Sequence, residues 1–284
     1  SMHYTLEPHT GTSKNINNYG RAVAYSVADA ADIAQAQTLS DTTAAYTPGE
    51  VAVQMVLPAS TVRRISDPDL EGRVAQILNN AYDLKEDGDG CAQFSSFTTA
   101  ALGSASTVCS PGHGAAAAAG LRVGNSTANP EPAPAPLYWV IHPESAVPLA
   151  GRMVPYSNVP TGTNVYGFDG GAHLGVTVAN GGVTSYGERI ITRGINALGT
   201  LSGMEVRFDA NIAVDASAGA TGAAFSKMGF CFISEVEPRL DVDDTDKSMR
   251  GAKELNVWGS YTWGVYRAAA YGIPTTFDAA LPTS

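Results

Sequence analysis

The stretch after residue 66 predicts a long amphipathic helix, and this helix constrains the fold more than any other part of the chain. Asp67 can cap it, Pro68 suits its first position, and Glu71 places negative charge in the first turn. Gly88 and Gly90 mark its expected end, so it spans about twenty residues, or roughly 30 Å. Apolar residues at helical spacing form the face that we expect to be buried: Leu70, Val74, Ile77, Leu78, Ala81 and Leu84 or Lys85.

A strand is expected directly before this helix. Apolar residues at 51, 53, 55 and 57 recur at every second position, which is the period of a strand. Pro48 and Gly49 mark a turn in front of it. Together with the polar stretch 38–46, the segment predicts a two-stranded excursion. A lone hairpin is marginal in water, so this excursion needs a surface to lie on.

Shorter elements follow along the rest of the chain. No internal repeat at a fixed period is present. One long helix, separate strands and long excursions together indicate an α+β fold. We expect a helix at 112–123 and a turn or short helix at 144–149. Strands are expected at 137–141, 204–208, 225–233 and 256–266. An acidic connector is expected at 239–250 and an irregular β excursion at 152–187.

The low charge content suggests that neighbours cover much of the surface. Hydrophobic residues make up 44% of the chain, which favours a folded protein, but charged residues make up only 15%. The net charge of −10 argues against a protein that binds nucleic acid through its phosphates. No apolar run approaches the ~20 residues that span a bilayer, and no signal segment is evident, so we expect neither a membrane partner nor secretion.

Motifs of known catalytic chemistry are missing from the sequence. It contains no GxSxG, HExxH, GxxxxGK[ST] or strand-linked GxGxxG pattern, so we expect no enzyme and no cofactor. His142 with Glu144 could suggest acid–base chemistry, although a histidine that ends a strand is more often structural. The three tryptophans could form a sugar-binding platform, but core and interface packing is favoured at strand spacing.

Metal binding is also not expected. Cys91, Cys109 and Cys231 lie far apart, which gives neither a disulfide framework nor a zinc-ligand spacing. Cys109 with His113 could be half of a metal site, but no second pair accompanies them. The acidic run 241–246 resembles the start of a calcium loop, yet its sixth position lacks Gly and its twelfth lacks Glu, so a solvated acidic loop is favoured.

Four stretches, in this order, resemble the major capsid proteins of tailed bacteriophages, which share the Hong Kong 97 phage fold. The first is the strand YWVIHP at 138–143, and the second is GTLSGMEV at 199–206 with Asn211-Ile212 after it. The third is the strand 224–233, and the last is 239–272, with an acidic connector, aromatic strands and Tyr271-Gly272. The likeness covers most of the chain after about residue 25.

The resemblance implies a division of the chain within an α+β fold. A long spine helix would lie near 67–87, and an elaborated segment at 152–187. The implied parts are an N-terminal arm at 1–24, an extended loop at 25–62, a peripheral domain at 63–125, an axial domain at 126–231, and a return through the peripheral domain at 232–284.

The resemblance also implies a function. The chain would be a major capsid protein that self-assembles, as pentamers and hexamers, into an icosahedral head shell around a phage genome. Scaffold, portal and decoration proteins would be further partners, and packaged DNA would be contacted only non-specifically. Its place would be the virion capsid, assembled in the host bacterial cytoplasm. The alternatives are an encapsulin-like nanocompartment shell and, in another class, a monomeric hydrolase or carbohydrate-binding protein.

Two groups of residues are candidates for contacts between subunits. A strand that found no partner would be an aggregation-prone edge, so Val51, Val53 and Met55 are expected to be covered by another copy. Arg63 and Arg64, at the base of the hairpin, could pair with acidic residues of an adjoining copy, although solvated surface charge is favoured. The acidic candidates are Asp241, Asp243, Asp244 and Asp246.

Overall fold

The chain forms two compact units, each built from segments that are far apart in the sequence. The computed structural model describes residues 2–5, 12–19, 41–58, 60, 69–124, 131–152, 200–243 and 252–280. Unit 1 comprises Ser1–Asp89 with Cys231–Gly264, and unit 2 comprises Gly90–Phe230 with Val265–Ser284.

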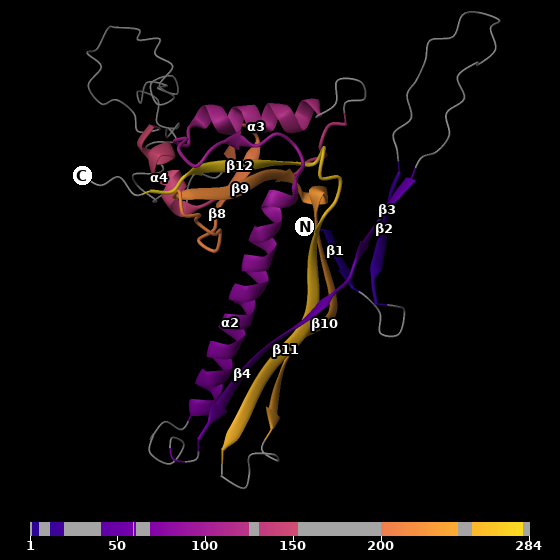
Figure 1. Cartoon of the computed structure of the whole chain (residues 1–284), viewed down its shortest axis with the longest axis vertical. Coiled ribbons are helices and arrows are strands. Elements are labelled where there is room, and N and C mark those ends of the chain that lie inside the picture. Colours follow the sequence, from indigo (N-terminus) through magenta and orange to yellow (C-terminus); the bar gives the residue numbers. More distant parts are fainter. Residues whose placement is uncertain are drawn as a thin grey trace, which may run out of the picture. The chain divides into compact units, whose positions relative to one another are not determined.

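Unit 1 contains a four-stranded sheet in the order β1-β10-β11-β4 (Figure 1). Its strands are β1 (Met2–Thr5), β10 (Phe230–Asp243), β11 (Lys253–Val265) and β4 (Gly49–Leu57). β1 runs parallel to β10, and β4 runs antiparallel to β11. A separate antiparallel ribbon joins β2 (Lys14–Tyr19) to β3 (Asp41–Tyr46).

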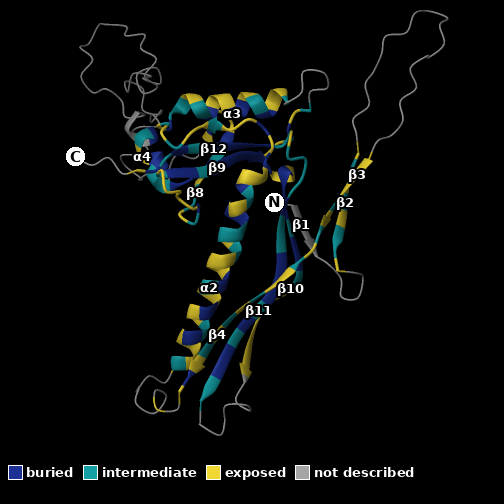
Figure 2. Cartoon of the chain, viewed as in Figure 1, coloured by how far each residue is buried: buried dark blue, intermediate teal, exposed yellow. Residues whose placement is uncertain are grey.

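The long helix α2 (Leu70–Ala92) packs on one face of this sheet. Figure 2 shows its buried side turned toward the strands. The rings of Tyr82 and Tyr261 meet edge to face, with centroids 5.9 Å apart and planes at 75°. The buried residues of this core are Leu57, Val74, Leu78, Tyr82, Leu255, Val257 and Tyr261.

The predicted buried face of the helix is partly wrong. Ile77 and Leu84 are 55% and 59% exposed, whereas Tyr82 is 1% exposed. Val74, Leu78 and Tyr82 follow one another at four-residue steps and so lie on one side of the helix. Ile77 is about 100° around the helix from Leu78, which turns it toward solvent.

The predicted end of the helix is also wrong, because α2 continues through Gly88 and Gly90 to Ala92. Contacts from β11 hold its last turns. The indole Nε1 of Trp263 donates a 2.9 Å hydrogen bond to the backbone oxygen of Glu86. Tertiary contacts of this kind offset the cost of about 1 kcal/mol that each glycine brings to a helix.

Unit 2 contains a six-stranded mixed sheet in the order β5-β12-β9-β6-β8-β7. β6 is parallel to β8, and β12 is parallel to β5, while the other neighbours are antiparallel. The strands are β5 (Leu102–Gly103), β6 (Leu137–Ile141), β7 (Thr200–Leu201), β8 (Met204–Phe208), β9 (Gly219–Ser226) and β12 (Gly272–Asp278). The helices are α3 (Pro111–Val123), α4 (Pro143–Arg152) and the short η1 (Gln93–Ser96) and η4 (Lys227–Gly229).

The core of unit 2 is centred on Trp139, which is fully buried in β6. Its indole Nε1 donates a 3.2 Å hydrogen bond to the hydroxyl of Thr275, which satisfies the ring's polar atom. The helix α3 packs closely here, because a Cβ on Gly114 would lie 2.8 Å from the Trp139 ring. Leu121 and Phe277 complete this core from α3 and β12.

The structure confirms the α+β class and most of the predicted elements of unit 2. The strands at 137–141 and 204–208 and the helix near 112–123 are present. The predicted strand 225–233 is wrong in one respect, because η4 interrupts it. There Ser226 Oγ accepts from the backbone N–H of Met228, and a Cβ on Gly229 would lie 2.7 Å from the Tyr271 carbonyl oxygen. The excursion at 152–187 lies outside the described residues after Arg152.

Candidate assembly surface

Strand β4 forms an edge of the unit 1 sheet. It pairs along its whole length with β11, from Gly49 opposite Tyr261 to Leu57 opposite Lys253, and no strand of the described residues pairs with its other side. Natural edge strands are usually protected by Lys, Pro, a bulge or short length. β4 is nine residues long, contains neither Lys nor Pro, and carries one charged residue, Glu50. Within the described part of the chain, this side of β4 is therefore available to pair with another strand.

The candidate contact residues Val51, Val53 and Met55 lie on the core side of this edge strand. All three are partly buried and pack against the core beneath α2. The residues between them point to the other face, where Val56 is 42% exposed. The period of two is confirmed, while a contact of Val51, Val53 and Met55 with another copy stays a prediction.

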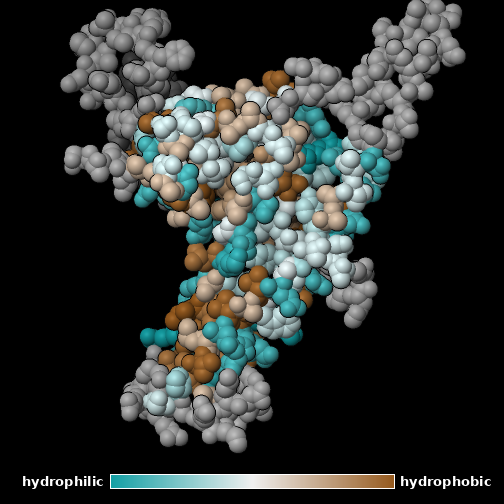
Figure 3. Space-filling view, viewed as in Figure 1, coloured by the Kyte–Doolittle hydropathy of each residue, from teal (hydrophilic) through white to brown (hydrophobic). Residues whose placement is uncertain are grey.

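An apolar stripe lies on the outer side of α2. Ile77 and Leu84, seven residues apart, share one side of the helix and are exposed. Figure 3 shows hydrophobic side chains gathered on the surface of unit 1 over this part of the helix. The sequence pattern placed both residues in the core, so it missed this stripe.

The second group of candidates falls largely outside the described residues. Arg63, Arg64, Asp244 and Asp246 are not among them, and the side chain of Asp243 is not described. Asp241 lies in β10 and is exposed. The pairing of these arginines with the acidic residues is therefore not tested by the fold.

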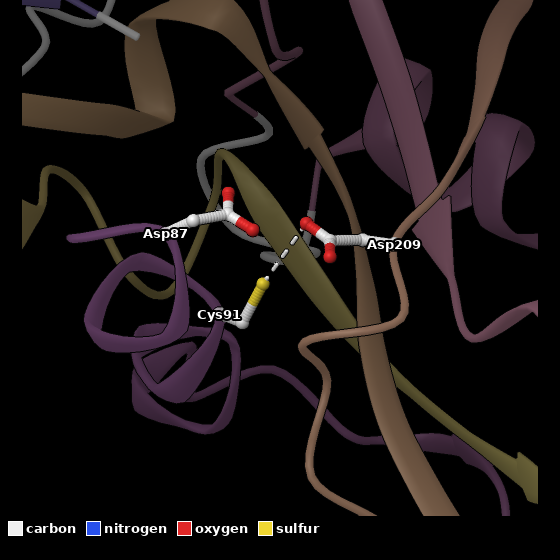
Figure 4. A group of neighbouring side chains, drawn as sticks. All are labelled: Asp87, Cys91 and Asp209. Atoms are coloured by element: carbon white, nitrogen blue, oxygen red, sulfur yellow. Dashed lines mark hydrogen bonds between the residues drawn. The ribbon is translucent and has the colours of Figure 1, made fainter. Parts of the chain in front are cut away.

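One hydrogen bond in unit 2 joins two side chains that carry reactive groups. The thiol of Cys91 donates a 3.3 Å hydrogen bond to Oδ2 of Asp209 (Figure 4). Oδ1 of Asp209 accepts a hydrogen bond from the backbone N–H of Asn211. Asp87 precedes Cys91 by one helical turn in α2. Within unit 2, Cys91 and Asp209 offer one sulfur and one carboxylate, fewer than the four ligands of a structural zinc site.

The other residues of chemical interest have structural contacts. Nδ1 of His142 accepts a 3.3 Å hydrogen bond from the backbone N–H of Glu144 at the start of α4. Nδ1 of His113 lies 2.9 Å from the hydroxyl of Ser110, so this imidazole belongs to the N-terminal cap of α3. Cys109 is fully buried. Hydrogen bonding of the two histidines and burial of Cys109 therefore give all three residues a structural role.

Burial controls the ionisation of two side chains in unit 1. Burial raises the pKa of the Cys231 thiol from 9.0 to about 11. Burial, and then the hydrogen bond to Asp89, raise the pKa of Tyr261. Both groups are therefore held in their neutral forms, as packing residues rather than nucleophiles.

No protein-family model and no curated protein sequence matches this chain. Solved structures do match it. The head structure of Helicobacter pylori bacteriophage KHP40 matches with a TM-score of 0.67 and 11% identity, over 98% of this chain and 88% of that chain. This chain has the phage capsid fold.

Two further structures agree over nearly the whole length. The capsid of the cyanophage P-SCSP1u matches with a TM-score of 0.66 and 11% identity, over 99% of this chain and 86% of that chain. A structure from Mycobacterium phage Che8 matches with a TM-score of 0.63 and 16% identity, over 96% and 86%. The Hong Kong 97 phage-like fold expected from the sequence is confirmed. No helix among the described residues is long and apolar enough to cross a bilayer.

Proposed function

We propose that this chain is a major capsid protein that self-assembles into the icosahedral head shell of a bacteriophage. The observation that carries the proposal is the phage capsid fold, which extends over 96–99% of the chain in the matches to phage structures described above. A match over one domain alone would also fit a protein of different function. A match over the whole chain includes the segments with which a capsid subunit contacts other copies. The protein acts as a structural subunit rather than as an enzyme.

The geometry of unit 1 supports assembly from many copies. A closed shell needs different patches on each copy that meet head to tail. The open edge of β4 and the apolar stripe of Ile77 and Leu84 are two such patches, and both are costly to leave in water. We assign the long helix and sheet of unit 1 to the peripheral domain, and the six-stranded sheet of unit 2 to the axial domain around the five- and six-fold positions.

The remaining partners follow from the role of a head shell. The virion capsid is the place of the mature protein, and the host bacterial cytoplasm is the place of assembly. Scaffold, portal and decoration proteins are partners of the growing or mature shell. The net charge of −10 is consistent with an inner surface that encloses DNA without binding its phosphates tightly.

Electron microscopy and sedimentation of the purified chain test the proposal. We expect closed shells or ring-shaped capsomers. A protein that remains a folded single subunit of 29.4 kDa at every concentration and salt condition would overturn it. Particles from infected cells should contain nucleic acid, whereas a protein cargo would point to an encapsulin-like compartment.

A further inference from the structure

The face of the unit 1 sheet that points away from α2 carries the charged residues of β10. Phe232 packs against the core beneath α2, and side chains alternate along a strand, so residues 235, 237, 239 and 241 point to the opposite face. Two contacts agree with this. Ser260 Oγ donates a 3.2 Å hydrogen bond to Glu235, and the Arg239 guanidinium lies 3.9 Å from the centroid of the Trp258 ring.

This face, which we call the acidic face, is negatively charged. Glu237 and Asp241 are exposed on β10, and the exposed Glu50 of β4 lies opposite Ser260 on the same side. Among the described residues of the acidic face, Arg239 is the single cation. The sequence extends the negative run beyond the end of β10 with Asp244 and Asp246.

The acidic face already holds one guanidinium. The Cζ atom of Arg239 lies over the Trp258 ring, which is a cation–π contact. Exposed carboxylates beside an aromatic ring suit the planar, permanently charged side chain of arginine better than that of lysine. The surface is therefore suited to further guanidinium groups.

A complementary segment exists in the same sequence. Arg63 and Arg64 are its only two adjacent cations. We propose that the acidic face of one copy receives Arg63 and Arg64 of a second copy. This rests on the proposed function, because it assigns one of the contacts between shell subunits. Each copy carries both the acidic face and the arginine pair, as a head-to-tail contact requires, and the opposite charges fix its orientation.

The contact is individually weak and sensitive to salt. An exposed ion pair changes an equilibrium by about fivefold at most. Two such pairs in every copy should lower the protein concentration needed for shell formation by about tenfold. Salt screens exposed charges over a distance of about 8 Å at physiological ionic strength, so shells should form less readily as salt rises.

Charge reversal in two variants tests the contact. The first variant is Arg63→Glu with Arg64→Glu, and the second is Glu237→Lys with Asp241→Lys. Each should need about tenfold more protein than the unchanged chain to form shells. An equimolar mixture of the two should form shells at a lower protein concentration than either variant alone, because wherever unlike copies meet, the introduced glutamates face the introduced lysines and the original arginines face the original carboxylates. A matched control, Arg207→Glu with Lys227→Glu, makes the same charge change on exposed residues of unit 2 and should assemble normally.

Each other outcome has a definite meaning. Unchanged assembly of the first variant overturns the contact. If one chain that carries all four exchanges assembles while the mixture does not, the arginines pair within their own chain and the contact between copies is wrong. If neither the mixture nor the chain with all four exchanges forms shells, the proposed contact is overturned as well. Should a variant lose its circular dichroism signal, the salt dependence of the unchanged chain decides, and shells that form equally well in high salt overturn the proposal. If the unchanged chain forms no shells at all, the proposed function itself fails.

Discussion

The hydroxyl of Tyr261 donates a 3.0 Å hydrogen bond to the carboxylate of Asp89, and so joins β11 to the last turns of α2. Asp89 also accepts from Lys85, one helical turn earlier. Hydrogen bonds to charged groups contribute about 1.5–3 kcal/mol. This contact helps to explain why the helix continues past Gly88.

Replacing Tyr261 with Phe should lower the free energy of unfolding by about 1.5–2 kcal/mol, because the ring contact with Tyr82 stays while the hydrogen bond is lost. Urea denaturation followed by circular dichroism measures the change. Tyr138→Phe is the matched control, since no described residue hydrogen-bonds to its hydroxyl, and it should change stability by less than about 0.5 kcal/mol. Equal effects of the two substitutions would contradict the role given to Asp89.

Two glycines should respond to alanine in opposite directions. A Cβ on Gly88 would meet nothing within 4 Å, whereas a Cβ on Gly222 would lie 2.1 Å from the carbonyl oxygen of Val140 in β6. Gly88→Ala should therefore raise the free energy of unfolding by about 0.5–1 kcal/mol. Gly222→Ala should lower it by about 1–3 kcal/mol, because strand backbones must separate. Thermal unfolding of both variants checks the signs, and a stabilising Gly222→Ala would contradict the close approach of β9 to β6.

Cys231 should make unit 1 sensitive to alkali. Its pKa is raised to about 11, so the folded state holds the thiol proton more tightly than the unfolded chain does. Stability from this group is therefore complete below the ordinary pKa of 9.0 and is lost as pH rises to about 11. The loss should reach about 3 kcal/mol.

The comparison with Cys231→Ala isolates this effect, because that variant should lack the same part of the pH dependence. At pH 8 the native thiol should also react with iodoacetamide at least about a hundredfold more slowly than an unfolded one. Rapid labelling of Cys231 in the folded protein would contradict its burial.

The edge of β4 gives a prediction for assembly. Val56→Lys places a charge on an exposed position of the edge strand, which discourages pairing with another chain. We expect the fraction of protein in shells to fall roughly tenfold, while the stability of the subunit changes by less than about 0.5 kcal/mol. Val108→Lys, at a similarly exposed valine of unit 2, is the control for sedimentation analysis. Normal shells from Val56→Lys would show that no neighbour covers this edge.

Local patterns in the sequence predict most elements but not their partners. The apolar run at 137–141 and the alternation at 51–57 each identify a strand, because burial on two faces or one leaves a distinct pattern. The pairing of β4 with β11 joins residues about two hundred positions apart, and no local signal encodes it. The interruption at η4 was likewise not predicted, because the run from Phe225 to Ile233 is largely apolar and no local signal in it marks the break.

The candidate surface was predicted less well than the fold. Helical spacing placed Ile77 and Leu84 with the core residues, since apolar character alone does not tell a core position from one that another molecule covers. The contact between Arg239 and Trp258 depends on how β10 and β11 pair, and it becomes visible only in three dimensions. The acidic run itself was evident from the sequence, because charge is carried by residue type.

Unit 1 is assembled from the beginning of the chain and from a segment near its end, with most of unit 2 encoded between them. During translation, β4 leaves the ribosome long before β11, its partner, has been made. While unit 2 is being synthesised, β4 of the nascent chain is therefore not yet paired with β11. This strand is rich in valine and carries a single charge. On polysomes that produce many copies at once, this interval is when wrong pairing between chains has its best opportunity, and a chaperone that shields β4 would act most usefully there.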